Sequence, residues 1–181
     1  IRSWLSELTN TVARPPSVQP VDAWLEQQWR NAIEAGRLPA AQLLSPLQEQ
    51  ALWQHVVRED MAKRGGFSLS HPKSAALRAQ SAWHKLLMHN AERIQNLWSF
   101  FEYDDDCDVF ASWVSLFSKQ LATRGAITRY QAYQQLCTVT PEEKPSVALY
   151  PYPALPPLTS NVLEHLCQVT RLHPARDNQN P

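Results

Sequence analysis

The triplet Glu142-Glu143-Lys144 has residue types that could cut a phosphodiester bond. In a metal-dependent nuclease, a (D/E)-x-K pattern places a carboxylate and a lysine on one strand beside Mg²⁺. Here Pro141 and Pro145 bracket the triplet, and proline cannot donate the backbone hydrogen bonds that such a strand needs. We therefore expect a surface loop at this position, and an independent metal-dependent nuclease is the least favoured function.

A run of carboxylates could hold a hard cation such as Mg²⁺ or Ca²⁺ through its oxygen atoms. The run lacks the D-x-D-x-D-G spacing of a calcium-binding loop, and acidic side chains are favoured in the first turn of a helix, where the dipole is positive. It therefore predicts a helix start rather than a metal site. Its members are Glu102, Asp104, Asp105, Asp106 and Asp108.

No residue pattern points to other catalytic chemistry. None of the 6 histidines lies in H-E-x-x-H or beside a cysteine at zinc spacing, and no serine lies in G-x-S-x-G. With only 4 glycines, the chain contains neither G-x-x-x-x-G-K-[ST] nor G-x-G-x-x-G, the loops that bind phosphates. We expect no catalytic residue, no metal site, no cofactor and no small-molecule substrate for this chain.

Cysteine use and hydropathy bear on the compartment. Cys107, Cys137 and Cys167 are an odd number without a C-x-x-C pair, which is typical of a reducing cytoplasm rather than of a disulfide scaffold. No stretch approaches the roughly 18 apolar residues of a membrane helix, and no charged-then-apolar secretory signal opens the chain. We expect a cytoplasmic protein that does not bind a membrane.

Charge is spread unevenly along a chain that is neutral overall. The 17 basic residues equal the 17 acidic ones, which argues against a globally basic nucleic-acid-binding protein. Between residues 61 and 101, however, six bases stand against the single acid Glu92, a local net charge of +5. Such a region can contact phosphates, although a solvated surface has the same composition. The predicted nucleic-acid-binding residues are Lys63, Arg64, Lys73, Arg78, Lys85 and Arg93.

Proline placement and apolar spacing predict a helical protein. None of the 14 prolines lies between Lys73 and Thr140, and eight lie in the last 41 residues. Trp24, Trp29, Trp53, Trp83 and Trp113 lie on apolar helical stripes, which is typical of core packing rather than of base stacking. The predicted helical stripes run over residues 4–12, 21–33, 47–61, 75–87, 94–101, 109–121, 133–136 and 161–169.

Residues 146–150 are the only predicted strand. A single strand cannot form a sheet by itself, so its partners are expected in an oligomer or in a part of the protein outside this chain. We predict an all-α fold, an irregular helical bundle with a short β-strand remnant near the C-terminus. The expected division is a helical bundle domain over residues 1–140, a strand-turn-helix stub of a RecA-like domain over 141–170, and a disordered tail over 171–181.

Segments between residues 20 and 166 resemble one bacterial family. Its early region is similar to P-V-D-A-W-L (20–25) and L-S-P-L-Q-E-Q-A-L-W (44–53), and its helical middle to A-Q-S-A-W (79–83) and V-F-A-S-W (109–113). V-A-L-Y (147–150), followed by L-P-P-L and L-E-H-L, resembles the strand-turn-helix at which the family's chain returns to an ATPase-like core. The family is the bacterial "probable DNA repair" proteins. They have a superfamily-1 helicase-like front portion and a C-terminal PD-(D/E)xK nuclease, and are similar to the AddB subunit of the AddAB helicase-nuclease.

The resemblance implies that this chain is an excised front section of such a protein. It would hold the helical subdomain inserted in the first RecA-like domain, with stubs of that domain on either side. Two departures bear on the parent's activity. Pro151-Tyr152 stands where the family usually has Gly-Phe, and residues 150–155 supply none of the carboxylates with which an active helicase holds Mg²⁺. No functional residue of the family can be transferred to a numbered position here.

These observations predict a non-catalytic helical part of a DNA-repair helicase/nuclease-like protein, contributing to DNA binding or shaping the DNA path. The expected partners are DNA and, within the parent assembly, a partner subunit. An alternative is a protein–protein interaction module, in which the proline-rich segment 151–157 or exposed tryptophans dock a partner subunit.

Overall fold

The computed structural model of the 181-residue chain describes residues 17–64, 71–90, 105–150 and 154–172. The helices predicted over residues 4–12 and 94–101 lie outside these ranges, as does most of the proline-rich segment. No described helix is long and apolar enough to cross a lipid bilayer.

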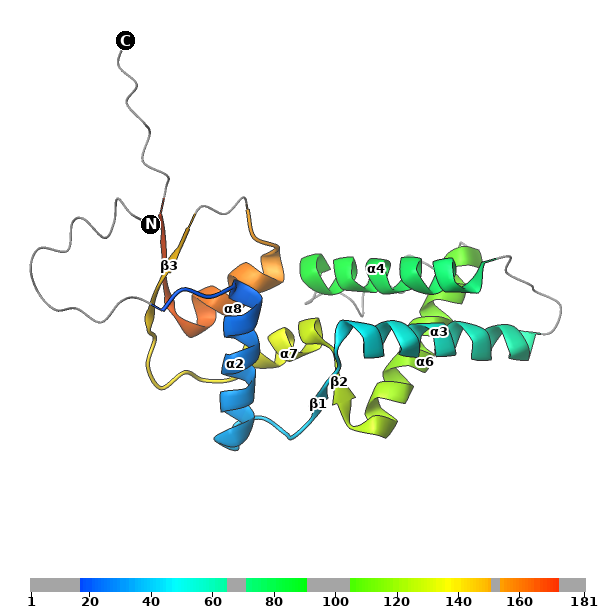
Figure 1. Ribbon diagram of the computed structural model, residues 1–181, viewed down its shortest axis with the longest axis horizontal. Helices are drawn as coiled ribbons and strands as arrows, with labels where there is room; N and C mark the ends of the chain where they lie inside the picture. Colours follow the sequence, from blue (N-terminus) through cyan, green and yellow to red (C-terminus); the bar gives the residue numbers. More distant parts are fainter. Residues whose placement is uncertain (1–16, 65–70, 91–104, 151–153, 173–181) are drawn as a thin grey trace, which may run out of the picture.

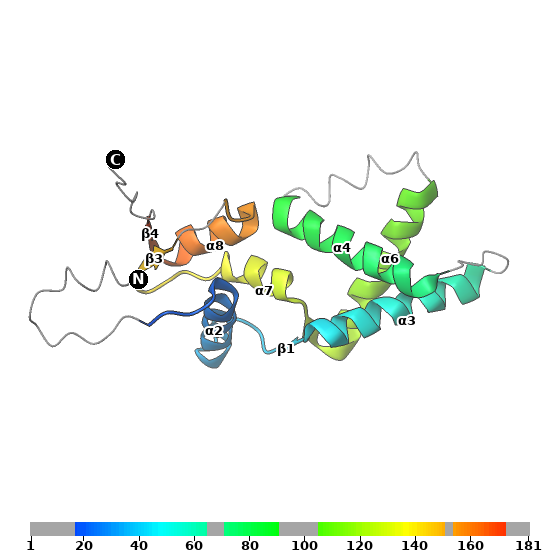
Figure 2. The same cartoon turned by 45° about the horizontal axis from the view of Figure 1, so that its top comes forward.

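The described helices form an elongated molecule with two lobes (Figure 1). One lobe, which we call the α2 lobe, is built from α2 (Val21–Glu34), α7 (Arg129–Leu136) and α8 (Pro157–Leu166). The other, the α3 lobe, is built from α3 (Pro46–Arg64), α4 (Pro72–Asn90) and α6 (Asp105–Arg124). The turned view in Figure 2 shows α6 inclined across α3 and α4. The predicted all-α class is confirmed.

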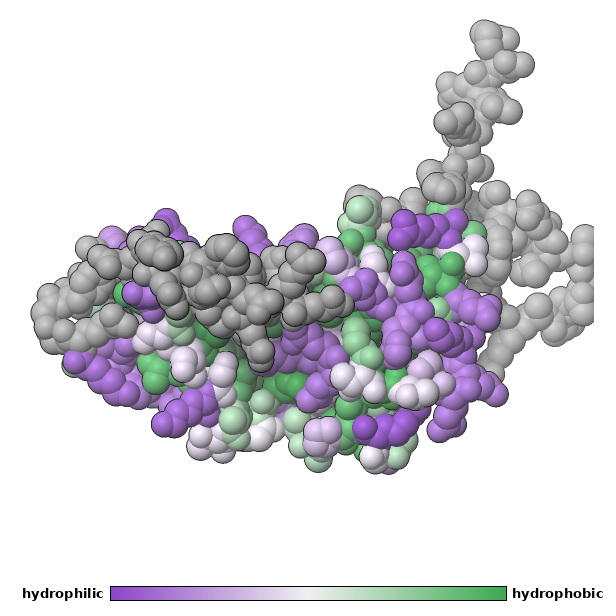
Figure 3. Space-filling view, turned by 180° about the vertical axis from the view of Figure 1, so that it is seen from behind, coloured by the Kyte–Doolittle hydropathy of each residue, from purple (hydrophilic) through white to green (hydrophobic). Residues whose placement is uncertain are grey.

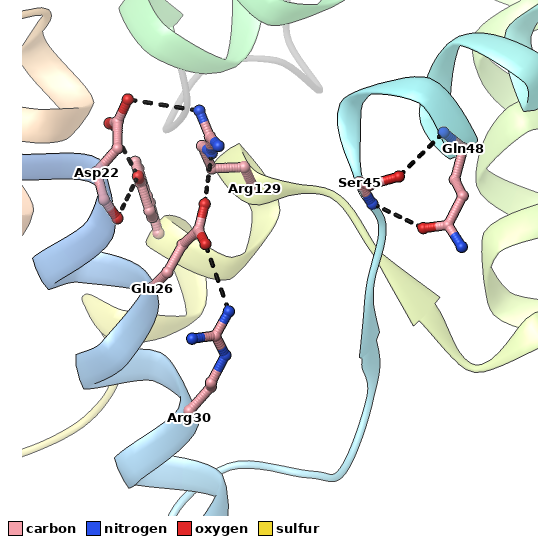
Figure 4. A network of polar contacts seen from close by, with 7 residues as sticks. Asp22, Glu26, Arg30, Ser45, Gln48 and Arg129 are labelled. Atoms are coloured by element: carbon pink, nitrogen blue, oxygen red, sulfur yellow. Dashed lines mark hydrogen bonds and ion pairs between the residues drawn. The ribbon is translucent and has the colours of Figure 1, made fainter.

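Local signals in the sequence set most helix boundaries. Before α3, the Ser45 backbone N–H donates to Gln48 Oε1 at 2.8 Å and the Gln48 N–H donates to Ser45 Oγ at 3.3 Å, which is a complete capping box (Figure 4). Thr128 and Gln131 form a second capping box before α7. Gly36 and Gly125 follow α2 and α6 with φ of 68° and 58°, the left-handed conformation that ends a helix and favours glycine.

Four short strands pair in two parallel ladders within the described residues. β1 (Gln42–Leu43) pairs with β2 (Ala126–Ile127) at the point where the chain enters and leaves the α3 lobe. β3 (Ser146–Leu149) pairs with β4 (Gln168–Arg171), and α8 connects them. Parallel strands need such a crossover connection because their directions do not reverse.

The prediction of a solitary strand with a helix over residues 161–169 was wrong. α8 begins at Pro157, and Cys167 already has the extended angles φ −146° and ψ 166°. In β4, Val169 packs against the core while Gln168 and Thr170 are exposed. Val169 follows Leu166 by three residues, so it fits a helical stripe as well as a strand, and the sequence pattern alone favoured the helix. β4 also includes Arg171, where we expected a tail to begin.

Each lobe is held together by its own hydrophobic cluster. The cluster of the α2 lobe includes Leu25, Trp29 and Tyr133, and the cluster of the α3 lobe includes Trp53 and Phe117. Trp29, Trp53, Trp83 and Trp113 are buried, which confirms core packing for these four, and Trp24 is half-buried. Among the described residues, no tryptophan is exposed as the docking alternative requires.

We expect Trp53→Ala to destabilise the protein by about 3–5 kcal/mol, because Trp53 is fully buried and stacks on Phe117 with ring centroids 4.2 Å apart. Trp53→Phe should cost less than half as much, since the indole N–H has no acceptor among the described residues and phenylalanine keeps the stacked ring. Urea unfolding of the three proteins measures both differences. Equal losses for the two variants would contradict the role of the stacked ring.

Candidate nucleic-acid interface

One face of α4 presents a stripe of hydrogen-bond donors to solvent. The stripe residues are separated by three or four positions, so they lie along one side of the helix. All are exposed, and the first and last are about 22 Å apart at 1.5 Å per residue. We call this set the α4 stripe: Ser74, Arg78, Ser81, Lys85 and His89.

The buried side of α4 determines where the stripe points. Ala76, Ala79, Trp83 and Leu87 are buried in the cluster of the α3 lobe. At 100° per residue, Arg78 and Lys85 lie on the opposite side of the helix. α4 contains no aspartate or glutamate, and neither Arg78 nor Lys85 forms an ion pair within the described parts of the chain. Their charges are therefore available to an external anion.

The other predicted basic residues do not belong to this stripe. Lys63 Nζ donates to Glu59 Oε1 at 2.7 Å; this hydrogen bond and the lysine charge lower the pKa of Glu59. Lys63 is thus locally neutralised. Lys73 is exposed on α4 but is turned about 140° from Arg78. Arg64 is the last residue of α3, and the structure does not describe its side chain. Arg93 lies outside the described residues.

Charge counting along the sequence missed the uncharged members of the stripe. Ser74, Ser81 and His89 carry no formal charge at neutral pH, so they did not contribute to the count that identified this region. Their spacing relative to Arg78 and Lys85 is the signal that could have found them. Serine hydroxyls between basic side chains are common phosphate contacts.

The competing sites do not form in the described parts of the chain. Residues 141–145 are a loop, with Glu142, Glu143 and Lys144 exposed, which confirms the prediction for the triplet. Asp105 begins α6, as expected for a helix start. No group of three or more His, Cys, Asp or Glu side chains could hold a metal ion among the described residues. Burial raises the pKa of the Cys167 thiol, which disfavours the nucleophilic thiolate.

A buried acid–base pair joins α3 to α4 within the α3 lobe. Glu49 on α3 is 5% exposed and lies 2.6 Å from Nε2 of His84 on α4. The His84 ring contacts the edge of Tyr130 on α7, with ring centroids 4.8 Å apart. Burial, followed by the charge of Asp22, raises the pKa of the Tyr130 phenol. This pair is a structural feature, because its carboxylate is enclosed and its imidazole is already engaged.

A second polar network joins α2 to α7 (Figure 4). Arg129 Nε donates to Glu26 Oε1 at 2.8 Å, and the Tyr133 hydroxyl donates to Asp22 Oδ1 at 3.0 Å. Burial, followed by the charge of Asp22, raises the pKa of Tyr133 well above its ordinary value. The network fixes the two helices relative to one another and leaves no free base or nucleophile.

The rear face is mixed in character. Figure 3 shows small apolar patches between hydrophilic side chains on this face. The large exposed apolar side chains of the described residues, Val18, Leu47, Leu77 and Tyr150, are scattered over different elements. Single exposed apolar residues of this kind are normal on protein surfaces.

No protein-family model, curated protein or solved structure matches the chain.

We expect His84→Ala to reduce the free energy of unfolding by about 2–4 kcal/mol, because it leaves the enclosed Glu49 carboxylate without its partner. The double variant Glu49→Ala/His84→Ala should cost less than the sum of the two single changes. His55→Ala is the matched control, since His55 is 53% exposed and its Nε2 lies 3.6 Å from Glu59 Oε2, a longer contact than that of His84. This change should alter stability by less than about 0.5 kcal/mol. Additive losses in the double-mutant cycle would contradict the coupling.

Stability should fall as pH rises above about 10, the pKa of tyrosine in an unfolded chain. The folded-state pKa values of Tyr130 and Tyr133 are raised, so the unfolded state releases these protons first. Above pH 10 the raised pKa of Tyr133 then contributes a loss approaching about 1.4 kcal/mol per pH unit. Urea unfolding between pH 9 and 11.5 should give a shallower decline for Tyr133→Phe, whereas Tyr150→Phe, at a 52% exposed position, should match the parent. An unchanged slope in Tyr133→Phe would refute this contribution.

Proposed function

We propose that this chain binds nucleic acid through the α4 stripe and catalyses no reaction itself. The observation that carries the proposal is the carboxylate-free face of α4, on which Arg78 and Lys85, without an ion pair among the described residues, flank Ser81. Phosphate groups carry negative charge and accept hydrogen bonds, so they match this face in both respects. The preferred partner is DNA, as part of a DNA-repair helicase/nuclease-like protein.

The topology supports this assignment to a larger machine. The α3 lobe, which carries the stripe, begins after β1 and ends before β2, and these strands are neighbours in a parallel ladder. This is the arrangement of a helical subdomain inserted into another domain. The β3-α8-β4 unit is likewise the repeating unit of parallel α/β sheets, as a stub of a RecA-like domain would be.

Binding through this stripe should be weak and dependent on salt. Arg78 and Lys85 can each neutralise one phosphate, and each phosphate contributes about 0.7 (single strands) to 0.9 (duplex) to the slope of log K against log salt. Contacts from these side chains to the phosphate backbone carry no sequence information. We therefore expect little preference between DNA sequences.

The double variant Arg78→Ala/Lys85→Ala tests the proposal. Fluorescence anisotropy with a labelled 20-nucleotide DNA, single-stranded and duplex, should give salt-dependent binding by the parent chain. The variant should bind at least tenfold more weakly at low salt, and its salt slope should be shallower by about 1.4–1.8.

The control keeps the number of charges removed the same. Arg37→Ala/Arg124→Ala removes two exposed arginines outside α3 and α4, and it should reduce affinity by less than twofold. Equal losses in the two double variants would assign binding to net charge rather than to the stripe. If the parent chain shows no salt-dependent binding to either DNA, the proposal fails.

A further inference from the structure

A cleft of about 580 Å³ lies in the region between α6, α7 and the short β1–β2 ladder. Its volume falls within the range of about 300–1,000 Å³ that is usual for ligand sites. It is separate from the α4 stripe, since no residue of α4 lines it. The proposed nucleic-acid contact therefore does not account for it.

The lining of the cleft is uncharged among the described residues. One wall is made of small residues, including Ala40, Ala122 and Gly125, which leave room for a ligand close to the backbone. The facing wall is the side of α7 that carries Gln131, Gln134 and Gln135. No opposite charge among these lining residues would stabilise a charged ligand.

The orientation of two glutamine amides is fixed by donors inside the fold. The Thr128 backbone N–H donates to Gln131 Oε1 at 3.1 Å, and Trp29 Nε1 donates to Gln135 Oε1 at 3.0 Å. Both partners can only donate, so each amide oxygen is turned toward its donor, and the NH₂ groups have no partner within the described residues. The Gln134 side chain has no hydrogen-bond partner within the described residues. The cleft therefore offers amide N–H donors on an uncharged surface.

We propose that this cleft binds an uncharged, extended polypeptide segment of a partner protein. Carbonyl groups of an extended backbone accept hydrogen bonds from amide N–H groups without carrying charge. The side of α7 that lines the cleft runs from Gln131 to Gln135 and is about 6 Å long, which matches about two residues of extended chain at 3.3 Å each. A nucleobase fits less well, because no aromatic ring among the described lining residues could stack on it.

Nuclear magnetic resonance titration of the ¹⁵N-labelled chain tests the proposal. The probe is a capped hexapeptide of alternating alanine and threonine, with charged counterparts that carry glutamate or lysine in place of threonine. The uncharged peptide should shift the side-chain NH₂ signals of Gln131, Gln134 and Gln135 saturably, and both charged peptides should bind at least fivefold more weakly.

Two arginine substitutions on neighbouring residues of α6 provide the matched comparison. Ala122→Arg puts a bulky charge into the cleft, whereas Thr123→Arg puts it one residue away from the lining; both positions are exposed. Ala122→Arg should weaken peptide binding at least tenfold, and Thr123→Arg by less than twofold. The proposal fails if the glutamine signals do not move with the uncharged peptide, if both variants behave alike, or if adenosine moves those signals and the peptide does not.

Discussion

The packing of Tyr130 between two hydrophobic clusters is the constraint on which the described structure depends. Among the described residues, Tyr130 alone packs against both clusters. Its ring meets His84 of the α3 lobe on one side and Tyr133 of the α2 lobe on the other. α7 must therefore keep one orientation to satisfy both lobes, and the capping box at Thr128 and the ion pair between Arg129 and Glu26 hold it there.

The same division between buried and exposed faces produces the features that we connect with function. Trp83 and Leu87 anchor α4 in the core, and this anchoring turns Arg78 and Lys85 outward. On α7, buried Tyr133 and Leu136 place the glutamines on the opposite wall, toward α6. In both helices, the side chains that the core buries determine which side chains face a partner. The two surfaces are therefore held in place by the packing of α4 and α7.

The sequence predicted those parts of the structure that depend on neighbouring residues. Ser45 with Gln48, Thr128 with Gln131, and the glycines after α2 and α6 place helix boundaries through contacts that span a few positions. β4 was missed because four residues with one apolar side chain give no distinct period, and its strand identity depends on β3, some 20 residues away. The contact between Trp29 and Gln135 spans 106 positions, so no local pattern could reveal the orientation of that amide or the cleft beside it. The basic region was located by charge, but which of its members point outward was decided by the buried face of α4.

The β1–β2 ladder has a consequence for how the chain reaches this structure. Pairing Leu43 with Ile127 closes a loop of more than 80 residues, and the entropy of closing a flexible loop of this length costs about 4 kcal/mol. Two residue pairs of ladder cannot offset that cost while the intervening chain is unfolded. The helices of the α3 lobe must therefore condense first, or together with the ladder, to bring the two strands within reach. The α2 lobe can complete its packing only after the α3 lobe has formed, because the α3 lobe lies between α2 and α7 in the sequence and brings these two helices together.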